Sequence, residues 1–180
     1  MASVPVPVAV RPDTGCVGAK LYFPDGRIQH AGVRVGFNGV ASHPFLFFPG
    51  KHPGYFGRLG MRQELSAVTA ACLLLRRSIF EEVGGLNETD LAIAYNDVDL
   101  CLKVASAGYR NIWTPYAELV HHESASRGRD NTPDKRRRLH SEIGFMKRKW
   151  KTEVFNDPAY NTNLSLIDLD AMYTPPLWRL

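Results

Sequence analysis

The sequence predicts a single domain of the α/β or α+β class, and three observations support this prediction. Short apolar runs of strand-forming residues alternate along the chain with segments in which apolar residues recur at helical spacing. The 180 residues fit one domain, and hydrophobic residues make up 44% of them, enough to form a buried core. The 3 cysteines show no CxxC spacing, which argues against a disulfide scaffold and against zinc and suits a reducing compartment.

Composition excludes a membrane span and points to one basic segment. No run of about 18 apolar residues is present, and residues 1–12 lack the pattern of a secretory signal. The net charge of +4 arises locally, because residues 127–151 contain ten Lys and Arg but only three Asp and Glu. Such a segment favours an anionic partner, namely nucleic acid, a membrane surface or phosphate; the simpler interpretation is a solvated helix face.

The first elements along the chain are two predicted strands and a loop. Residues 16–23 are rich in strand formers, the turn residues 24–26 follow, and residues 28–35 return as the second strand of a hairpin. Residues 36–64 are rich in glycine and aromatic residues without a sustained period, which predicts a long functional or mobile loop. The apolar run 65–75 is typical of a strand covered on both faces.

Three helices are predicted from their end signals and periodicity. Residues 78–83 begin with a capping box and end before a double glycine. A second helix begins near Asn96 and ends at Gly108. A third begins after the N-cap residue Thr132, with proline in its first turn and basic residues on its exposed faces.

Two short strands and a tail complete the predicted elements. Residues 109–113 and 117–121 resemble strands and are separated by Pro115. The tail from Phe155 is rich in Asn, Pro and Asp. We expect it to lie as an extended segment over the body of the domain.

Asp97 and Asp99 form the first candidate site, because both lie in the first turn of a predicted helix. The unpaired backbone N–H groups there favour an ionised carboxylate that can accept hydrogen bonds or protons. The alternative interpretation is helix capping, with Asn96 as the N-cap and Asp99 as the capping-box acid.

His121 and His122 form the second candidate site. Adjacent side chains of a strand point to opposite faces, so the two imidazoles are not expected to bind one ion together. One could face a site while the other packs, and a purely structural role is the alternative. In the glycine-rich loop, Tyr55 and its neighbours could stack on a sugar or a base, or could lie on a mobile surface.

Several short sequence motifs follow one another along the chain, and their order is informative. They are residues 17–21 (VGAKL), 24–32 (PDGRIQHAG), 66–74, 83–88, 96–103 (NDVDLCLK), 107–110, 115–118, 121–128 (HHESASRG) and 157–166. In this order they resemble bacterial family-2 glycosyltransferases of the GT-A fold, the rhamnosyltransferase-like enzymes. The resemblance extends from about Arg11 to Leu166 and departs from the family pattern at Asn96, Ala70 and Asn87, where Glu, Gly and Asp are usual.

The resemblance implies an α/β fold, an incomplete GT-A domain whose mixed β-sheet is flanked by helices. The N-terminal nucleotide-binding half, with its DxD motif, would be absent, so the chain resembles the C-terminal, acceptor-side part. Residues 1–180 would then be one domain, with residues 11–128 as its core and residues 129–180 as a basic helix and tail. On this basis the isolated chain is expected to be inactive.

The resemblance also implies roles for individual residues. Asp97 matches the general base, which takes the proton of the acceptor hydroxyl in an inverting transfer. His122 or His121 matches a ligand of a divalent cation, Mn or Mg, on the donor diphosphate; without the DxD half the chain is not expected to retain it. Arg127 and Arg129 are expected near the diphosphate. The expected acceptor site consists of Thr69, Ala70, Ala71, Asp99 and Tyr55.

The implied function is a metal-dependent glycosyltransferase. It would transfer a sugar from a nucleotide-sugar donor to a saccharide or lipid-linked acceptor in bacterial surface polysaccharide synthesis. The expected location is the cytoplasm, where residues 134–151 could bind the anionic inner face of the plasma membrane more readily than a specific nucleic acid.

Two alternatives remain open at the level of sequence. One is a non-catalytic module that binds an acceptor or a partner and self-associates through the face that the absent half would cover. The other is a glycoside hydrolase that uses Asp97 with Asp99 or Glu123 as its two carboxylates.

Overall fold

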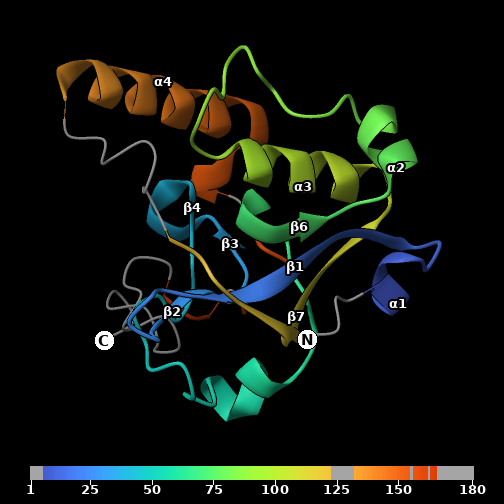
Figure 1. The fold of residues 1–180 in the computed structure, drawn as a ribbon. Coiled ribbons are helices and arrows are strands. Elements are labelled where there is room, and N and C mark those ends of the chain that lie inside the picture. Colours follow the sequence, from blue (N-terminus) through green and yellow to red (C-terminus); the bar gives the residue numbers. More distant parts are fainter. Residues whose placement is uncertain (1–5, 123–131, 155, 162, 166–180) are drawn as a thin grey trace.

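A mixed five-stranded sheet forms the centre of the molecule, in the order β2-β1-β7-β5 with β6 also paired to β1 (Figure 1). The computed structural model describes residues 6–122, 132–154, 156–161 and 163–165. β1 runs parallel to β7, and the other pairings in this sheet are antiparallel. The strands are β1 (Thr14–Tyr22), β2 (Ile28–His30), β5 (Gln63–Glu64), β6 (Leu73–Leu74) and β7 (Arg110–Val120). This is an α/β arrangement, as the sequence predicts.

β1 is buried along almost its whole length, and two glycines bring other segments close to it. A Cβ atom at Gly18 would lie 2.6 Å from Cβ of Val68, and one at Gly15 would lie 2.3 Å from Cγ1 of Val104. Real side chains do not approach so closely. The glycines therefore allow the segment after β5 and the helix that contains Val104 to pack directly on the strand.

The helices cover the sheet in layers (Figure 1). α3 (Asn96–Ser106) packs on β1 and β7, and hydrogen bonds between side chains join α3 to α4 (Pro133–Trp150). The shorter helices are α1 (Val6–Ala9) and α2 (Arg77–Glu82). All three helices that the sequence predicts are therefore present.

The capping residues agree with the prediction for one helix and differ for two, although α3 begins at Asn96 as predicted. Thr132 is the N-cap of α4, and its hydroxyl accepts a hydrogen bond from the backbone N–H of Lys135 at 3.4 Å. α2 follows Arg76, which provides no side-chain cap. α3 follows Tyr95 in the left-handed conformation at φ 61°, so Asn96 is the first helical residue and its predicted capping role is wrong.

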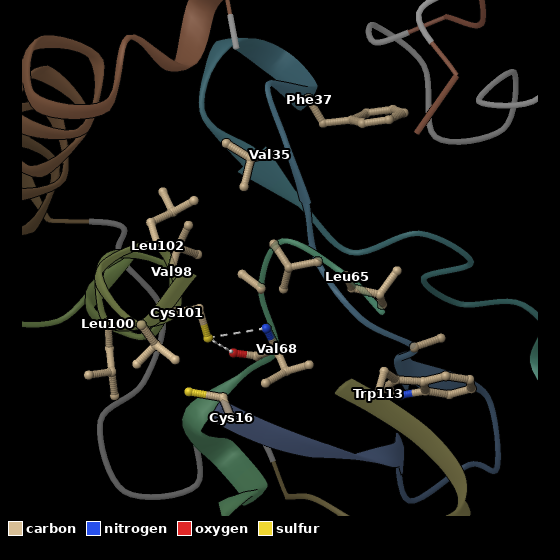
Figure 2. Close-up of a cluster of buried hydrophobic side chains, with 14 of the residues drawn as sticks. Cys16, Val35, Phe37, Leu65, Val68, Val98, Leu100, Cys101, Leu102 and Trp113 are labelled. Carbon is tan, nitrogen blue, oxygen red and sulfur yellow. Dashed lines mark hydrogen bonds between the residues drawn. The ribbon is translucent and has the colours of Figure 1, made fainter. Parts of the chain in front are cut away.

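The core lies between α3 and the sheet (Figure 2). Cys16, Cys101 and Trp113 are each 0% exposed, and Cys101 Sγ makes hydrogen bonds of 3.5 Å to the backbone N–H and carbonyl of Val68. Burial raises the pKa of the Cys101 thiol well above its ordinary value. All three cysteines are free thiols, so packing rather than disulfide bonding holds this part of the fold together.

The apolar run 65–75 is not a strand covered on both faces, which corrects the prediction. Residues 65–68 are buried and extended, but the chain then forms the 3₁₀ helix η3 (Ala70–Cys72) and the short strand β6. The Thr69 hydroxyl accepts the backbone N–H of Ala71 at 3.3 Å and caps this turn. A local side-chain hydrogen bond thus outweighs the apolar composition of the run.

Two other predicted strands have different limits. The return strand 28–35 is divided at Gly32, where φ is 93°, into β2 and β3 (Arg34–Val35). Pro115 does not divide the later strand, because β7 is continuous. The pairing of β1 with β7 shifts register at this point, and an irregular ladder does not need the N–H group that proline lacks.

The long loop and the tail agree with their predictions in broad terms. Between β3 and β5 the chain forms only the short elements η1 (Phe37–Gly39), β4 (Ala41–Ser42) and η2 (Tyr55–Gly60), and η4 (Thr152–Val154) follows α4. In the described part of the tail, Asp157 is 4% exposed. Its carboxylate accepts hydrogen bonds from Val35 N–H at 3.0 Å and from the Ser66 hydroxyl at 2.7 Å, which ties the tail to the body.

Over the ranges that the structure describes, none of the helices combines the length and the apolar character needed to cross a membrane.

Candidate functional site

A pocket of about 220 Å³ lies beside the end of β1 and contains three histidines. Segments that are distant in sequence form it: the end of β1, strand β2, the loop after β4, helix η3 and the residue that follows β7. Polar groups from four of these segments converge on one small volume, which is typical of a ligand site. The lining residues are Phe23, Gln29, His30, His43, Leu46, Phe47, Thr69, Ala71 and His121.

His30 is held in one tautomer. Its Nε2 accepts the backbone N–H groups of Gly32 at 3.3 Å and Thr69 at 3.4 Å, so the proton of the neutral ring lies on Nδ1. That Nδ1–H therefore donates to His43 Nδ1 at 2.9 Å. Burial, and then the neighbouring His43, lowers the pKa of His30 well below its ordinary value of 6.5. The ring therefore remains neutral and orients His43 at the pocket wall.

His121 is also oriented by a neighbour. Its Nδ1 lies 2.8 Å from Oε1 of Gln29, and because a carbonyl oxygen can only accept, Nδ1 must carry the proton. The lone pair of the neutral ring is then on Nε2, which is the arrangement of a metal-binding histidine whose second nitrogen is fixed by a hydrogen bond. His122 is exposed and does not line the pocket. Of the two predicted histidines, His121 is the one that the structure places at the pocket.

Asp97 lies on the other side of η3 from this pocket, in the first turn of α3. Its Oδ2 accepts the backbone N–H of Ala70 at 3.1 Å, and its Oδ1 accepts its neighbour Val98 N–H at 2.9 Å. Ala71, the next residue of η3, lines the pocket. The three predicted acceptor residues of η3 and its cap therefore lie between the carboxylate and the histidines.

Asp99, predicted for the acceptor site, is buried in the structure and bound by side chains of α3 and α4. It is 0% exposed, its Oδ1 accepts from Lys149 Nζ and Trp150 Nε1 at 2.7 Å each, and its Oδ2 lies 3.2 Å from Lys103 Nζ. Burial raises the pKa of Asp99, but these hydrogen bonds outweigh it and lower the pKa overall. Asp99 is therefore not available as a second carboxylate beside Asp97, which removes one form of the hydrolase alternative.

Other predicted residues are not brought to the pocket. Tyr55 lies in η2 with 42% of its surface exposed and does not line the pocket. Arg127, Arg129 and Glu123 lie outside the described residues. Among the residues that the structure does describe, no three His, Cys, Asp or Glu side chains are grouped to hold an ion.

Two site residues are not predicted from the sequence as functional, namely His30 and His43. His30 falls within the motif PDGRIQHAG, but nothing in the local pattern pairs it with a residue of the following loop. Their contact depends on the turn at Gly32 and on the course of the loop after β4, which only the folded chain defines.

Comparisons with known proteins found relatives that are much longer than this chain. It is 61% identical over 173 residues to the uncharacterized protein y4gI of Sinorhizobium fredii, covering 96% of this chain and 19% of that protein. It is 41% identical over 163 residues to the O-antigen biosynthesis protein RfbC of Myxococcus xanthus, covering 90% of this chain and 12% of RfbC.

A third relative covers less of the chain. The N-acetylglucosaminyl-diphospho-decaprenol L-rhamnosyltransferase of Mycobacterium tuberculosis is 32% identical over 130 residues, which are 66% of this chain and 41% of that enzyme. The chain thus spans less than half the length of each of these relatives. No family model matches the chain. No solved structure matches it either.

Proposed function

We propose that this chain carries the base and the acceptor side of a glycosyltransferase that acts in bacterial surface polysaccharide synthesis. The observation that carries the proposal is the hydrogen bond from Ala70 N–H of η3 to Asp97, because the neighbours of Ala70, namely Thr69 and Ala71, line the histidine pocket. The similarity to RfbC and to the mycobacterial rhamnosyltransferase supports the reaction class. A nucleotide-sugar donor and a saccharide or lipid-linked acceptor are the proposed substrates, and a family-2 enzyme of the GT-A fold is the proposed type.

The proposed reaction is a single displacement with inversion. The acceptor hydroxyl attacks the anomeric carbon of the donor while Asp97 takes the hydroxyl proton. The new bond joins the acceptor oxygen to the anomeric carbon, and the bond from that carbon to the nucleoside diphosphate breaks. Two backbone N–H groups hold the Asp97 carboxylate, so it is positioned before the acceptor arrives.

A divalent cation, Mn or Mg, is part of the proposal, and His121 is its proposed ligand. When bound, such an ion would stabilise the charge of the leaving diphosphate. The described residues provide one suitable imidazole and not a complete ligand set, so no step above depends on the ion. In an enzyme that combines this chain with a donor-binding part, chelation with EDTA should slow transfer, and added Mn or Mg should restore it.

Two partners of the chain are proposed in addition to its substrates. The basic helix α4 would bind the anionic inner face of the plasma membrane peripherally. Leu119, which is exposed on the face of β7 opposite to Glu118 and Val120, would contribute to a surface for self-association.

The proposed function is tested by the substitution Asp97→Asn in cells that carry the gene. The amide keeps the size of the side chain but only one of its two acceptor oxygens, and it accepts a proton poorly, so we expect surface polysaccharide to be lost or shortened on gels. Asp134→Asn is the matched control, because Asp134 is also in the first turn of a helix and is exposed. Normal polysaccharide in the Asp97→Asn cells would contradict the proposal.

A further inference from the structure

A second and larger pocket, of about 660 Å³, lies between the end of the sheet and η2. Phe23 lines this pocket and also the histidine pocket, so the two share a wall. The volume is within the range of pockets that bind small molecules. The lining residues are Lys20, Tyr22, Phe23, Pro24, Gly26, Gly50, Lys51, His52, Pro53, Leu59, Gly60, Glu118 and Val120.

Strand register explains how the polar groups of this pocket come together. Lys20 and Tyr22 are two residues apart on β1 and share one face, and Glu118 of β7 is paired with Lys20 in the parallel ladder. The Tyr22 hydroxyl donates to Glu118 Oε1 at 3.0 Å, and Lys20 Nζ donates to the carbonyl of Gly50 at 3.0 Å. These bonds fix a carboxylate, a phenol and an ammonium at one end of the pocket.

Lys20 and Tyr22 are shielded from solvent, whereas Glu118 is exposed. Lys20 is only 5% exposed, and burial lowers its pKa although the Glu118 charge opposes the change. Burial, and then the hydrogen bond to Glu118, raises the pKa of Tyr22 to about 12. Both groups are therefore partly desolvated, and a hydrogen bond that a ligand makes to them gains strength from the low polarity of the surroundings.

The rest of the wall combines apolar surface with two further polar side chains, Lys51 and His52. Phe23, Pro24, Pro53 and Leu59 provide apolar contacts. His52 Nδ1 accepts the backbone N–H of Gly54 at 3.0 Å, so its neutral ring carries the proton on Nε2. Donors and acceptors thus stand beside flat apolar surfaces, which matches a sugar ring with its hydroxyl edge and its C–H faces.

We propose that this second pocket is a saccharide-binding subsite for a neutral sugar unit. Glu118 is exposed, so an apolar ligand would displace water from its carboxylate without replacing the lost hydrogen bonds, at a cost that a sugar avoids. At the end of the pocket where the hydrogen-bonding groups gather, the charge of Glu118 offsets that of Lys20, which favours a neutral ligand there; Lys51 is a further cation of the lining. Phe23 separates this subsite from the histidine pocket. The subsite would therefore hold the acceptor sugar unit that adjoins the reacting unit. This assignment rests on the proposed function.

The subsite is tested by NMR titration of the ¹⁵N-labelled chain with N-acetylglucosamine and with methyl α-L-rhamnopyranoside. We expect amide shifts to change at residues of the subsite, with little change on α2. Glu118→Gln should weaken binding about tenfold, the effect of losing a hydrogen bond to a charged group. Glu81→Gln is the matched control, an exposed ion-paired glutamate on α2, and should bind like the unchanged chain.

Several results of this titration would overturn the proposed subsite. Equal affinity of the Glu118→Gln chain, or shift changes that avoid the subsite, would overturn the inference. Tighter binding of inorganic phosphate or of cyclohexanol than of both sugars would overturn it as well, in favour of an anion or an apolar ligand. If the amide spectrum shows that the Glu118→Gln chain is poorly folded, Lys20→Met is the second variant, since it also removes a polar group from the subsite.

The subsite and the proposed function can fail separately. Sugar binding at the subsite together with normal polysaccharide in Asp97→Asn cells would support the subsite and contradict the transferase. Loss of polysaccharide in those cells without sugar binding at the subsite would support the transferase and overturn the subsite.

Discussion

Two aspartates in the first turn of α3, Asp97 and Asp99, illustrate how position decides chemistry. Both were predicted from sequence as acids near a helix start, where backbone N–H groups favour a carboxylate. Asp97 is bound by two backbone N–H groups, one of which belongs to η3 beside the histidine pocket. Asp99 is fully buried and bound by Lys149, Trp150 and Lys103. Only the first remains available to a substrate.

The buried His30 predicts a pH dependence of stability. Its pKa is lower in the folded chain than the 6.5 expected when unfolded, so the unfolded chain binds more protons below that pH. The stabilisation is fully present above pH 6.5 and is lost as the pH falls. We expect the free energy of unfolding to decrease from pH 7 to pH 5, by up to about 1.4 kcal/mol per pH unit from this residue.

Urea unfolding followed by circular dichroism at several pH values measures this slope. His30→Gln should flatten it, since an amide oxygen can accept the same backbone N–H groups without titrating. His140→Gln is the control, because His140 is exposed on α4 and should leave the slope unchanged. An equally steep slope in the His30→Gln chain would exclude His30 as its cause.

At the scale of elements, α4 holds the helix that carries Asp97. Glu142 of α4 is 1% exposed and accepts the backbone N–H groups of Ile93 at 3.0 Å and Ala94 at 3.2 Å, just before α3 begins. Asp99 of α3 is bound in turn by Lys149 and Trp150 of α4. Buried carboxylates thus fix both the start of α3 and its first turn against α4.

Replacement of Glu142 by alanine should therefore destabilise the fold by about 2–4 kcal/mol, since two backbone donors lose their partner in a partly buried place. Glu153→Ala is the matched control: that glutamate pairs with Lys147 at 2.8 Å but is exposed, and its loss should cost less than about 1 kcal/mol. Denaturant unfolding of both variants gives the comparison. Equal losses would show that Glu142 does not anchor the turn before α3.

At the scale of the whole molecule, local signals predict the long helices. Tertiary contacts decide the limits of other elements and the pairing of the site residues. The cap at Thr132 and the helical periodicity of both segments predict the two long helices, because those signals are local. The run 65–75 is predicted as one strand because its composition does not reveal the turn at Thr69. The ion pair between Asp99 and Lys149 and the contact of His30 with His43 join residues far apart in sequence, so no spacing rule could predict them.

Folding also decides how much of the positive charge of α4 is available to an anionic partner. The sequence places seven basic residues on α4, and at least four of them pair with carboxylates. The pairs are Arg137 with Asp134, Arg138 with Glu142, Lys147 with Glu153 and Lys149 with Asp99. The helix therefore offers less charge to an anionic surface than its composition indicates, and binding to a membrane should be weak and sensitive to salt.

This expectation is tested with vesicles that contain 30% phosphatidylserine, by sedimentation at low and high salt. The variant should reverse the charge of Arg136 and Arg148, which are exposed. It should leave Arg138 unchanged, because an acid at this position would lie beside the buried Glu142. Each basic residue near such a surface contributes about 1 kcal/mol, so Arg136→Glu with Arg148→Glu should weaken binding by at least about 25-fold. Lys51→Glu with Arg62→Glu changes the net charge equally, away from α4. Equal weakening by both pairs would mean that net charge, and not α4, attracts the chain to the membrane.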